Sequence, residues 1–344
     1  MRVRMLPHPS GPPAPVARRL RGAKTDLGVI LSVEADLSGT PVAVVLVTYQ
    51  SARDLVMCLG SLERAAGPHP LEVVVVDNAS TDASVEIARG YGAKVVENHT
   101  NLGLSRAINI GVAATGAPWL LIANPDTWLS PKSLARLLAT ASSDRRIGCV
   151  GPHLVNPDGS DYPTGRRFPS PLMGAVHAAL APLWPENPAT RRYHMAGANR
   201  SQPLEVDWVS GACMLIRRQA FEEVSGFDPG YFMYFEEMDF CLRLQRTGWR
   251  TVFDPLAQVK HVVGGSTRSA PYHKVVHHHR SGLRFYCRRY AHDPRLALAP
   301  LVAGFLVLRG AASLARTAIS QRREASRERP SARSGPDEPG RPQT

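Results

Sequence analysis

The sequence predicts an α/β protein built on a doubly wound, mostly parallel sheet. Two apolar runs, at residues 41–49 and 71–78, are continuous and rich in β-branched side chains. Such runs are typical of strands that are buried on both faces of a parallel sheet. Patterns typical of helices separate the runs, so strand and helix alternate along the chain. The 344 residues, 44% of them hydrophobic, suffice for one large core or two modest ones.

The predicted elements follow one another from residue 41 to residue 124 without an internal repeat. Strands are expected at 41–49, 71–78, 94–98 and 119–124, and helices at 52–66, 82–90 and 104–115. Ser51 is the expected N-cap of the first helix. Ligands of such sheets bind beyond the carboxyl ends of the strands. Asp77, Asn78 and Asp126 stand at these ends, and the sequence therefore predicts a ligand site there.

The residues at these strand ends favour a nucleotide ligand but disfavour a nicotinamide dinucleotide. The turn after the first strand reads TYQSARD and contains no GxGxxG. Without glycines the backbone cannot closely approach a pyrophosphate. Carboxylate and amide side chains instead suit a nucleotide held through its base and ribose. A divalent cation, Mg²⁺ or Mn²⁺, would then contact the phosphates, because these ions combine one or two carboxylates with phosphate oxygens and water.

The second half of the chain contains an acidic cluster, FEEMDF, which opens a helix pattern. The N-terminal end of a helix favours ionised carboxylates, here those of Glu236 and Glu237. Asp239 precedes Arg243 by four residues, which predicts an exposed ion pair with a structural role.

Two other segments of the second half carry weaker signals. Residues 190–218 are expected to form a loop followed by a strand. His273 and His277 lie one helical turn apart, a spacing that can bind a metal, but no acid of the HExxH type accompanies them. Contact with a membrane, or ordinary surface positions, are the alternatives for this pair.

The two ends of the chain differ in composition from the middle. Residues 1–40 are rich in proline, lack the apolar segment of a signal peptide, and are expected to be a disordered extension. The apolar run at 296–308 is shorter than the roughly 20 residues that a spanning helix needs. With the interleaved arginines that follow, it predicts a helix over 291–322 lying on a membrane surface; a terminal helix covering the core is the alternative. Residues 323–344 are expected to form a disordered tail.

Charge and cysteine content limit the partners and the compartment. The formal net charge of +12 favours an anionic partner, although a coding bias toward arginine explains it equally well. The basic residues form no recognisable nucleic-acid reader, so nucleic acid is not expected as a partner. The five cysteines are scattered and form no CxxC pair. This pattern fits a reducing cytoplasm and neither a disulfide framework nor a zinc site.

Seven blocks between about residues 42 and 290 carry a resemblance to a known family. They read VVLVTYQSARDLVMCLGSL, VVVVDNASTD, NLGLSRAINIGVAA, LLIANPDTWL, VDWVSGACMLIRR, GFDPGYFMYFEEMDFCLRLQRTGW and KHVVGGSTR. In this order they resemble family 2 glycosyltransferases with the GT-A fold. The resemblance is closest to bacterial rhamnosyltransferases that use dTDP-L-rhamnose. It implies a GT-A domain over residues 41–290, with a nucleotide-binding N-terminal half and an acceptor-binding C-terminal half.

The resemblance also implies an activity. The chain is expected to be an inverting glycosyltransferase that moves L-rhamnose from dTDP-L-rhamnose to a lipid-linked saccharide in cell-wall or surface polysaccharide synthesis. N-acetylglucosaminyl-diphospho-polyprenol is one such acceptor. The expected location is the cytoplasmic face of the cell membrane, with the protein bound peripherally. Another nucleotide sugar such as a UDP-hexose, and a non-catalytic protein that binds nucleotide sugars, are the alternatives.

Residues for the donor follow from the same resemblance. Thr48 and Tyr49 would lie against the base, and Asp77 would contact the base edge or the ribose. The remaining nucleotide contacts implied by the resemblance are Asn78, Asn101, Gly103, Asn109 and Asn124. A turn cap is the alternative for Asp77, and a loop-forming role is the alternative for Asn101.

The segment NPD resembles the DxD motif of the family, with asparagine in place of the first acid. Asp126 is therefore the expected metal ligand, and His261 is expected to be the second one. Ser266 and Arg268, in a loop that also contains Thr267, are expected to hold the diphosphate. A buried histidine at a strand end is the alternative for His261.

The catalytic base implied by the resemblance is Glu237, although the family more often has aspartate at this position. Glu236 and Asp239 are the other candidates. Inversion needs one carboxylate to accept the proton of the acceptor hydroxyl. Trp208 and the Ser210–Gly211 pair are expected to face the donor sugar or the acceptor. The alternative is that all three acids only cap and solvate a helix.

Overall fold

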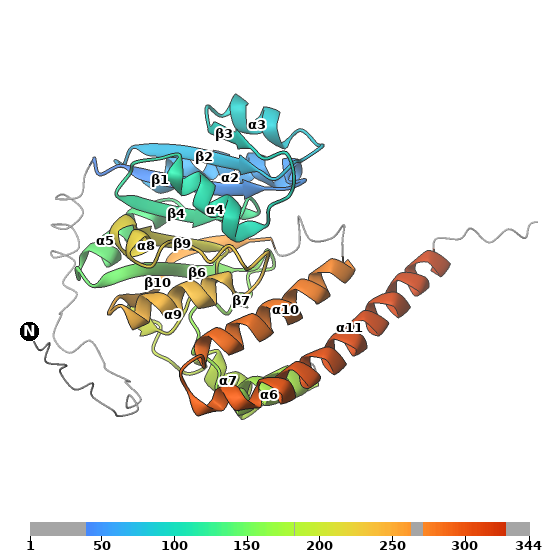
Figure 1. The fold of residues 1–344 in the computed structure, drawn as a ribbon. Coiled ribbons are helices and arrows are strands. Elements are labelled where there is room, and N and C mark those ends of the chain that lie inside the picture. The colour runs from blue at the N-terminus through green and yellow to red at the C-terminus, as the bar shows by residue number, and fades with distance from the viewer. Residues whose placement is uncertain (1–38, 182, 263–270, 328–344) are drawn as a thin grey trace, which may run out of the picture.

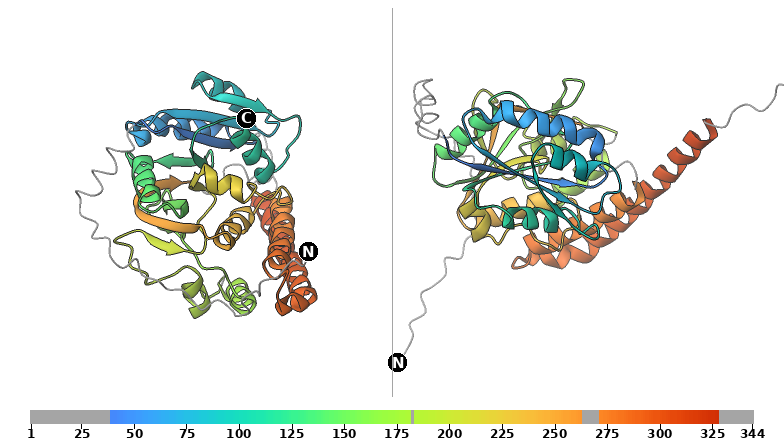
Figure 2. Two further views of the ribbon diagram at one scale, coloured as in Figure 1. Left: turned by 60° about the vertical axis from the view of Figure 1, so that its left-hand side comes forward. Right: turned by 90° about the horizontal axis from the view of Figure 1, so that it is seen from above.

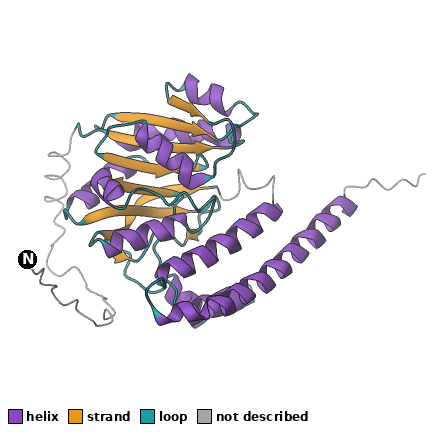
Figure 3. Ribbon diagram, viewed as in Figure 1, coloured by secondary structure: helices purple, strands orange, loops and turns teal. Residues whose placement is uncertain are grey.

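The computed structural model describes residues 39–181, 183–262 and 271–327, which form one mixed ten-stranded sheet with helices on both faces (Figures 1 and 3). The main path of the sheet runs in the order β3-β2-β1-β4-β9-β6-β10-β5, and two short strands, β7 and β8, pair beside it. The strands are β1 (Val42–Thr48), β2 (Leu71–Asp77), β3 (Lys94–Glu97), β4 (Trp119–Ala123), β5 (Thr127–Leu129), β6 (Ile147–Val155), β7 (Asp161–Tyr162), β8 (Leu204–Val206), β9 (Cys213–Arg217) and β10 (Arg250–His261). The helices are α2 (Ala52–Ala66), α3 (Ser84–Gly90), α4 (Leu104–Ala113), α5 (Ser133–Ser142), α6 (Pro171–Leu180), α7 (Pro188–Tyr193), α8 (Arg218–Glu223), α9 (Glu236–Arg246), α10 (Pro271–Arg289), the 3₁₀ helix η1 (Pro294–Leu298) and α11 (Ala299–Arg327).

The first half of the chain forms the parallel part of the sheet, as its continuous apolar runs predict. Strands β3, β2, β1 and β4 are mutually parallel, and Thr48 pairs in register with Asp77 at their carboxyl ends. Helix α2 begins after Ser51, and the carboxylate of Asp82 accepts a hydrogen bond of 2.9 Å from the Ala52 amide. The predicted α/β alternation is thus confirmed over residues 41–124.

The second half departs from a purely parallel sheet. Strand β9 lies antiparallel between β4 and β6, and β10 pairs parallel with β6 but antiparallel with β5. Because β9 runs opposite to β4, its first residues meet the carboxyl end of β4. Residues 190–218, expected to be a loop before a strand, contain the end of α7 and the short strand β8 as well as β9.

The core has two layers because successive side chains of each central strand point to opposite faces. Leu46 of β1 and Leu121 of β4 pack toward helices α2 and α5, whereas Val45 and Leu120 pack toward α4 and α9. Helices therefore cover both faces of the sheet, and the view from above in Figure 2 shows this layering.

Helices α10 and α11 form an arm in which α10 packs against both α9 and α11, and α11 extends away from the sheet (Figures 1 and 2). The segment Pro294–Ile319 is long and apolar enough to cross a membrane by length and composition, and only 6% of its apolar stretch is buried. The expectation that this segment is too short was therefore wrong, since it counted only the unbroken run and not the alanine-rich turns beyond Arg309. The low burial also contradicts the alternative of a helix that covers the core.

Candidate active site

The carboxyl ends of β1 and β2 place Thr48 and Asp77 side by side. The Thr48 hydroxyl donates to Asp77 Oδ1 at 2.8 Å, and the Ser80 amide donates to Asp77 Oδ2 at 2.7 Å. Asp77 is almost fully buried, whereas Tyr49 on the adjoining turn is exposed. Asp77 therefore caps the turn after β2, one of the two roles expected for it, and this cap fixes the carboxylate at the strand edge.

The amide-rich segment after β3 continues this edge. Asn78 Nδ2 contacts the Gly103 carbonyl at 3.4 Å, and the Gly103 amide donates to Asn101 Oδ1 at 3.0 Å. Gly103 has φ of +81°, and an added Cβ would lie 2.6 Å from the Phe232 carbonyl oxygen. Only glycine fits this position with positive φ. Gly103 directly precedes α4, and the backbone of Phe232 packs closely against it.

Asn109 does not join this group. Its Nδ2 donates to the Phe227 carbonyl at 2.7 Å, and its Oδ1 accepts from the Phe227 amide at 2.9 Å. Both polar atoms of the Asn109 side chain are therefore hydrogen-bonded to the backbone of Phe227. These two hydrogen bonds give Asn109 a structural role, and its expected contact with the nucleotide stays a prediction.

Asn124, Asp126 and His261 meet at the next strand ends. Asn124 follows β4 directly, and its backbone amide donates a hydrogen bond of 2.9 Å to the Ala212 carbonyl. Antiparallel pairing of β5 with β10 sets His261 opposite Thr127, and His261 Nε2 lies 3.4 Å from Asp126 Oδ1. The two groups come from distant parts of the chain to one buried spot.

The polar atoms at this spot fit a divalent cation. Within the described residues, Asp126 Oδ1 and His261 Nδ1 are buried without a hydrogen-bond partner. No group of three or more His, Cys, Asp or Glu side chains in the described ranges could hold a metal. Two protein ligands suffice where phosphate oxygens and water complete the shell. Ser266, Thr267 and Arg268, expected at the diphosphate, lie outside the described residues.

Gly211 connects this strand edge with α9. A Cβ built on Gly211 would lie 3.3 Å from the Glu237 Cβ. The backbone carbonyl of the next residue, Ala212, accepts a hydrogen bond from the backbone amide of Asn124. Gly211 thus joins the end of β4 to the first turn of α9. This contact brings Asp126 and Glu237 to the same edge of the sheet from segments that are far apart in the sequence.

Glu236 and Glu237 form a pair of neighbouring carboxylates with raised pKa values. Burial raises the pKa of Glu236 well above its usual range, and the charge of Glu237 adds to this shift. Burial also raises the pKa of Glu237, although backbone groups and the Arg166 guanidinium oppose the shift. One oxygen of each carboxylate, Oε2, is buried and has no hydrogen-bond partner among the described residues. Such a pair suits proton transfer.

Asp239 lies one turn further along α9 in a different environment. It is 1% exposed, Arg243 Nε donates to its Oδ2 at 2.7 Å, and Arg288 Nε donates to its Oδ1 at 2.9 Å. The predicted pair with Arg243 is therefore confirmed, but the pair is buried and not exposed as expected. Sequence spacing could not show that Arg288 of α10 would cover it.

The sequence reasoning missed an aromatic group around Arg166. The Arg166 guanidinium lies 4.7 Å from the ring centroid of Trp208 and 5.7 Å from those of Tyr162 and Tyr193. The positive charge of Arg166 lowers the pKa of Glu237 and so opposes the effect of burial on that carboxylate. These residues lie in the short strand β7, at the end of the short helix α7 and in loops, so no periodicity marks them, and only the expected position of Trp208 pointed toward them.

Tyr234 was also missed. Tyr234 and Phe235 have φ of +69° and +66°, a conformation that costs non-glycine residues energy. Burial raises the pKa of the Tyr234 hydroxyl to about 12, and the charge of Glu236 contributes. This hydroxyl lacks a hydrogen-bond partner among the described residues. Two successive strained residues immediately before α9 are typical of a functional turn.

The histidines of α10 serve packing in this structure. The ring of His277 stacks on Phe232 with centroids 4.4 Å apart. The ring centroid of His273 lies 6.5 Å from that of His277. The stack connects α10 with the segment that touches Gly103. His277 therefore belongs to the contact between α10 and the segment around Phe232.

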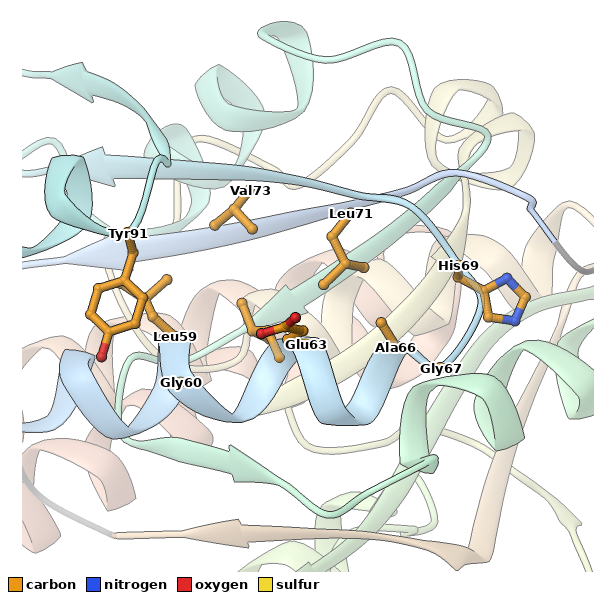
Figure 4. Close-up of a pocket in the computed structure, with 10 residues that line it drawn as sticks. Leu59, Gly60, Glu63, Ala66, Gly67, His69, Leu71, Val73 and Tyr91 are labelled. Carbon is orange, nitrogen blue, oxygen red and sulfur yellow. The ribbon is translucent and has the colours of Figure 1, made fainter.

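A pocket of about 330 Å³ lies elsewhere, between α2, β2 and the end of α3 (Figure 4). Its lining is mostly apolar, and its polar members include Glu63, His69 and Tyr91. It begins at the amino end of β2, opposite to the strand ends that hold Asp77. It is therefore separate from the candidate active site.

Family models match most of the chain. Residues 43–225 match the model described as glycosyl transferase family 2, and residues 187–317 match the one described as glycosyl transferase family group 2. The first match begins inside β1 and spans the strand ends with Asp77 and Asp126. The second covers α9, α10 and most of α11.

Similar curated proteins are glycosyltransferases. The N-acetylglucosaminyl-diphospho-decaprenol L-rhamnosyltransferase of Mycobacterium tuberculosis is 38% identical over 281 residues, 77% of this chain and 90% of that protein. The rhamnosyltransferase WbbL of Escherichia coli is 39% identical over 84 residues, 24% of this chain and 32% of that protein. The low-salt glycan biosynthesis hexosyltransferase Agl10 of Haloferax volcanii is 24% identical, covering 59% of this chain and 61% of that protein.

Solved structures confirm the fold. The mannosyltransferase PcManGT from Pyrobaculum calidifontis, in complex with GDP-Man and Mn²⁺, superposes with a TM-score of 0.50 at 16% identity, covering 85% of this chain and 84% of that one. GalNAc-T7 with UDP, GalNAc and Mn²⁺ gives a TM-score of 0.51 at 18% identity, over 79% and 55% of the two chains. The sheet described above is thus the GT-A fold, as the sequence blocks predict.

Proposed function

Because the chain belongs to glycosyl transferase family 2, we propose that it transfers L-rhamnose with inversion from dTDP-L-rhamnose to a lipid-linked saccharide in cell-wall or surface polysaccharide synthesis. The acceptor class we propose is N-acetylglucosaminyl-diphospho-polyprenol. The observation that carries the proposal is the 38% identity to an N-acetylglucosaminyl-diphospho-decaprenol L-rhamnosyltransferase over 90% of that protein's length.

The donor nucleotide is proposed to lie along the carboxyl ends of β1 and β2. The Thr48–Asp77 hydrogen bond, at 2.8 Å, holds a carboxylate at this edge, and Tyr49 exposes a ring beside it. Asn78, Asn101 and Gly103 continue the same edge. These groups suit recognition of a base and a ribose, which need hydrogen bonds and an aromatic face.

Glu237 is proposed as the catalytic base. Its carboxylate accepts the proton of the acceptor hydroxyl as the oxygen forms its bond to the sugar carbon and the bond from that carbon to the nucleotide diphosphate breaks. Its raised pKa brings it nearer to neutral pH, where a general base works best. Both carboxylate oxygens of Asp239 accept hydrogen bonds from arginines, which favours a structural role for that residue.

Asp126 and His261 are proposed to hold the divalent cation, Mg²⁺ or Mn²⁺. When bound, the ion would neutralise charge on the diphosphate leaving group. The imidazole of His261 favours Mn²⁺ slightly over Mg²⁺. The protein's own contribution is to keep the two ligand atoms together, 3.4 Å apart, in a buried place.

The protein is proposed to act at the cytoplasmic face of the cell membrane. The apolar, little-buried segment Pro294–Ile319 supports membrane attachment, and the lipid-linked acceptor of the Mycobacterium relative supports a reaction at the membrane. Buried cysteines without a disulfide fit a reducing compartment.

A donor panel with purified full-length protein tests the proposal. We expect transfer from dTDP-L-rhamnose to N-acetylglucosaminyl-diphospho-decaprenol with inverted anomeric configuration, measured by mass spectrometry and NMR. Transfer from a UDP-hexose alone would establish the alternative donor. Binding of nucleotide sugars without turnover on any acceptor would favour a non-catalytic role.

A further inference from the structure

Large exposed apolar side chains gather on α6 as well as on α11. Helix α6 contains no buried residue, and Leu183 and Trp184, just beyond it, are 88% and 54% exposed. Leu172 and Leu180 of α6 are exposed too. We call these four residues the α6 surface. Proteins in water rarely leave such a group uncovered, so the α6 surface marks a contact with something apolar.

The α6 surface adjoins the arm formed by α10 and α11. Arg309 of α11 donates to the Ala178 carbonyl of α6 at 3.4 Å and contacts His279 of α10 at 3.2 Å. Figure 1 shows α6 and α11 at the same end of the molecule. Leu301 and Leu308 of α11 are exposed there. Two apolar elements from separate parts of the chain therefore meet.

The charge of the neighbouring helices favours an anionic occupant. From residue 271 to residue 319 the sequence contains a single acidic residue, Asp293, which pairs with Arg295. Of the eight basic residues in this stretch, Arg284 and Arg288 pair with Asp228 and Asp239, which lie outside it, and Arg289 donates to the Pro169 carbonyl. Among the described residues, Lys274, Arg280 and Arg316 pair with no acid and supply the uncompensated positive charge. Apolar side chains flanked by arginine and lysine are typical of a helix that binds an anionic bilayer surface. Trp184 fits the same boundary, where tryptophan is enriched.

Helix α6 is also connected to the acceptor half of the site. His177 of α6 contacts Thr190 Oγ1 at 2.9 Å, and its ring lies 4.7 Å from that of Tyr193. Tyr193 in turn packs on Arg166, whose charge acts on Glu237. Helix α6 is thus connected through His177 and Tyr193 with Arg166.

We propose that the α6 surface inserts into the headgroup and acyl boundary of an anionic bilayer next to α11. The protein then contacts the membrane at two places, and the α6 contact turns its acceptor side toward the lipid. The second statement rests on the proposed function, whereas the insertion of the α6 surface does not.

Vesicle binding of the full-length protein tests the insertion. Vesicles of equal parts phosphatidylglycerol and phosphatidylcholine are sedimented with the parent protein and with Leu183→Glu/Trp184→Glu. Two carboxylates at exposed positions should leave the fold intact but lower the partition coefficient about tenfold or more, because apolar burial is lost. Val56→Glu/Met57→Glu on α2 is the matched control, since both side chains are exposed on a helix far from α6 (Figure 1). It should bind as the parent does.

A conservative variant checks the depth of insertion. Brominated lipid should quench part of the tryptophan fluorescence of the parent, and Trp184→Phe should bind vesicles normally but lose that quenching. Equal quenching in parent and Trp184→Phe, or parental binding by the double glutamate variant, would overturn the proposal. A dimer in solution that the glutamates dissociate would also overturn it and identify a second copy as the occupant.

Activity separates this proposal from the proposed function. Vesicle binding that depends on the α6 surface in a protein that transfers no rhamnose would refute the proposed function and leave the insertion standing. Rhamnose transfer by a protein whose vesicle binding ignores these residues would refute the insertion alone.

Discussion

His261 Nε2 lies 3.4 Å from Asp126 Oδ1, a separation that one cation can bridge. Asp126→Asn keeps the shape of the side chain but removes its charge. We expect Mn²⁺ affinity, measured by electron paramagnetic resonance, to fall by at least the roughly 10–100-fold that follows loss of an outer-shell partner. His261→Ala should act in the same direction. Asp158→Asn, in an exposed turn, is the control. Parental Mn²⁺ affinity in Asp126→Asn would refute the assignment.

Glu237→Gln should lower kcat by about 10²–10⁴-fold, the usual contribution of a general base. The amide keeps the size of the side chain but cannot accept the proton. Binding of the donor should hardly change, because the proposed nucleotide site lies around Asp77, at the carboxyl ends of β1 and β2. Single-turnover transfer at saturating donor measures the effect. A nearly normal rate would assign the base to another acid.

In a plot of kcat against pH, the acid limb should have an apparent pKa above the usual range of a glutamate. Burial raises the pKa of Glu237, and a base that is protonated at low pH is inactive there. Glu236 has the more strongly raised pKa of the two, so it is still protonated and neutral while Glu237 ionises. Glu236→Gln replaces one neutral group with another, and the limb should therefore stay where it is in the parent. A limb that moves to lower pH in this variant would show that Glu236 is charged when Glu237 ionises.

The same pair should make stability depend on pH. Because burial raises the folded-state pKa of Glu236, the folded protein binds the proton more tightly than the unfolded chain. This contribution is complete below the unfolded pKa and is lost as the pH rises through the folded pKa. At neutral pH, Glu236→Gln should raise the free energy of unfolding, because the amide is buried in its neutral form without the cost of taking up a proton, which is about 1.4 kcal/mol for each unit by which the pKa is raised. Denaturant titrations should show the gain disappearing toward pH 4.

The parallel half of the fold could be predicted from sequence because its signal is local. Continuous β-branched runs and the acids after them place Asp77 and Asp126 at strand ends without any knowledge of contacts. The antiparallel insertion of β9, and with it the approach of Gly211 to Glu237, depends on long-range pairing that no local pattern encodes. Arg166 was missed for the same reason.

Side-chain roles were harder to predict than positions. Asn109 stands in a segment rich in amides, yet its amide bonds to Phe227 at a distant point in the chain. Asp239 has the spacing of an exposed helical pair, but Arg288 from α10 covers it. Burial by a distant element decides both cases, and periodicity within one helix cannot report it.

Asp239→Asn should act mainly on stability. The pair with Arg243 is buried, so the removal of one charge leaves arginines without their partner. We expect a loss of about 3–5 kcal/mol in the free energy of unfolding, where an exposed helical pair would cost only about 0.3–0.5 kcal/mol. Chemical denaturation measures this loss. A small loss of stability together with a dead enzyme would instead make Asp239 the base.

Gly211→Ala should slow catalysis without unfolding the protein. The added Cβ would lie 3.3 Å from Glu237 Cβ and 3.5 Å from its Cγ, so the glutamate must move by a few tenths of an ångström. Since a displacement of about 1 Å can cost about 10²-fold in rate, we expect kcat to fall roughly tenfold. Donor affinity and thermal stability should stay near those of the parent. Gly116→Ala is the control, because nothing lies within 4 Å of the Cβ that it adds.

A double-mutant cycle with Glu237→Asp shows whether the effect passes through the base. Aspartate keeps the Cβ that an alanine at position 211 would crowd, but it is one methylene shorter, so its carboxylate already lies away from the position of the parent's and a further displacement costs less. If the alanine acts by displacing the carboxylate, its cost should shrink in the Glu237→Asp background, and the two changes should couple by about 0.5–3 kcal/mol. Equal losses in both backgrounds would mean that Gly211 serves the acceptor directly and does not position Glu237.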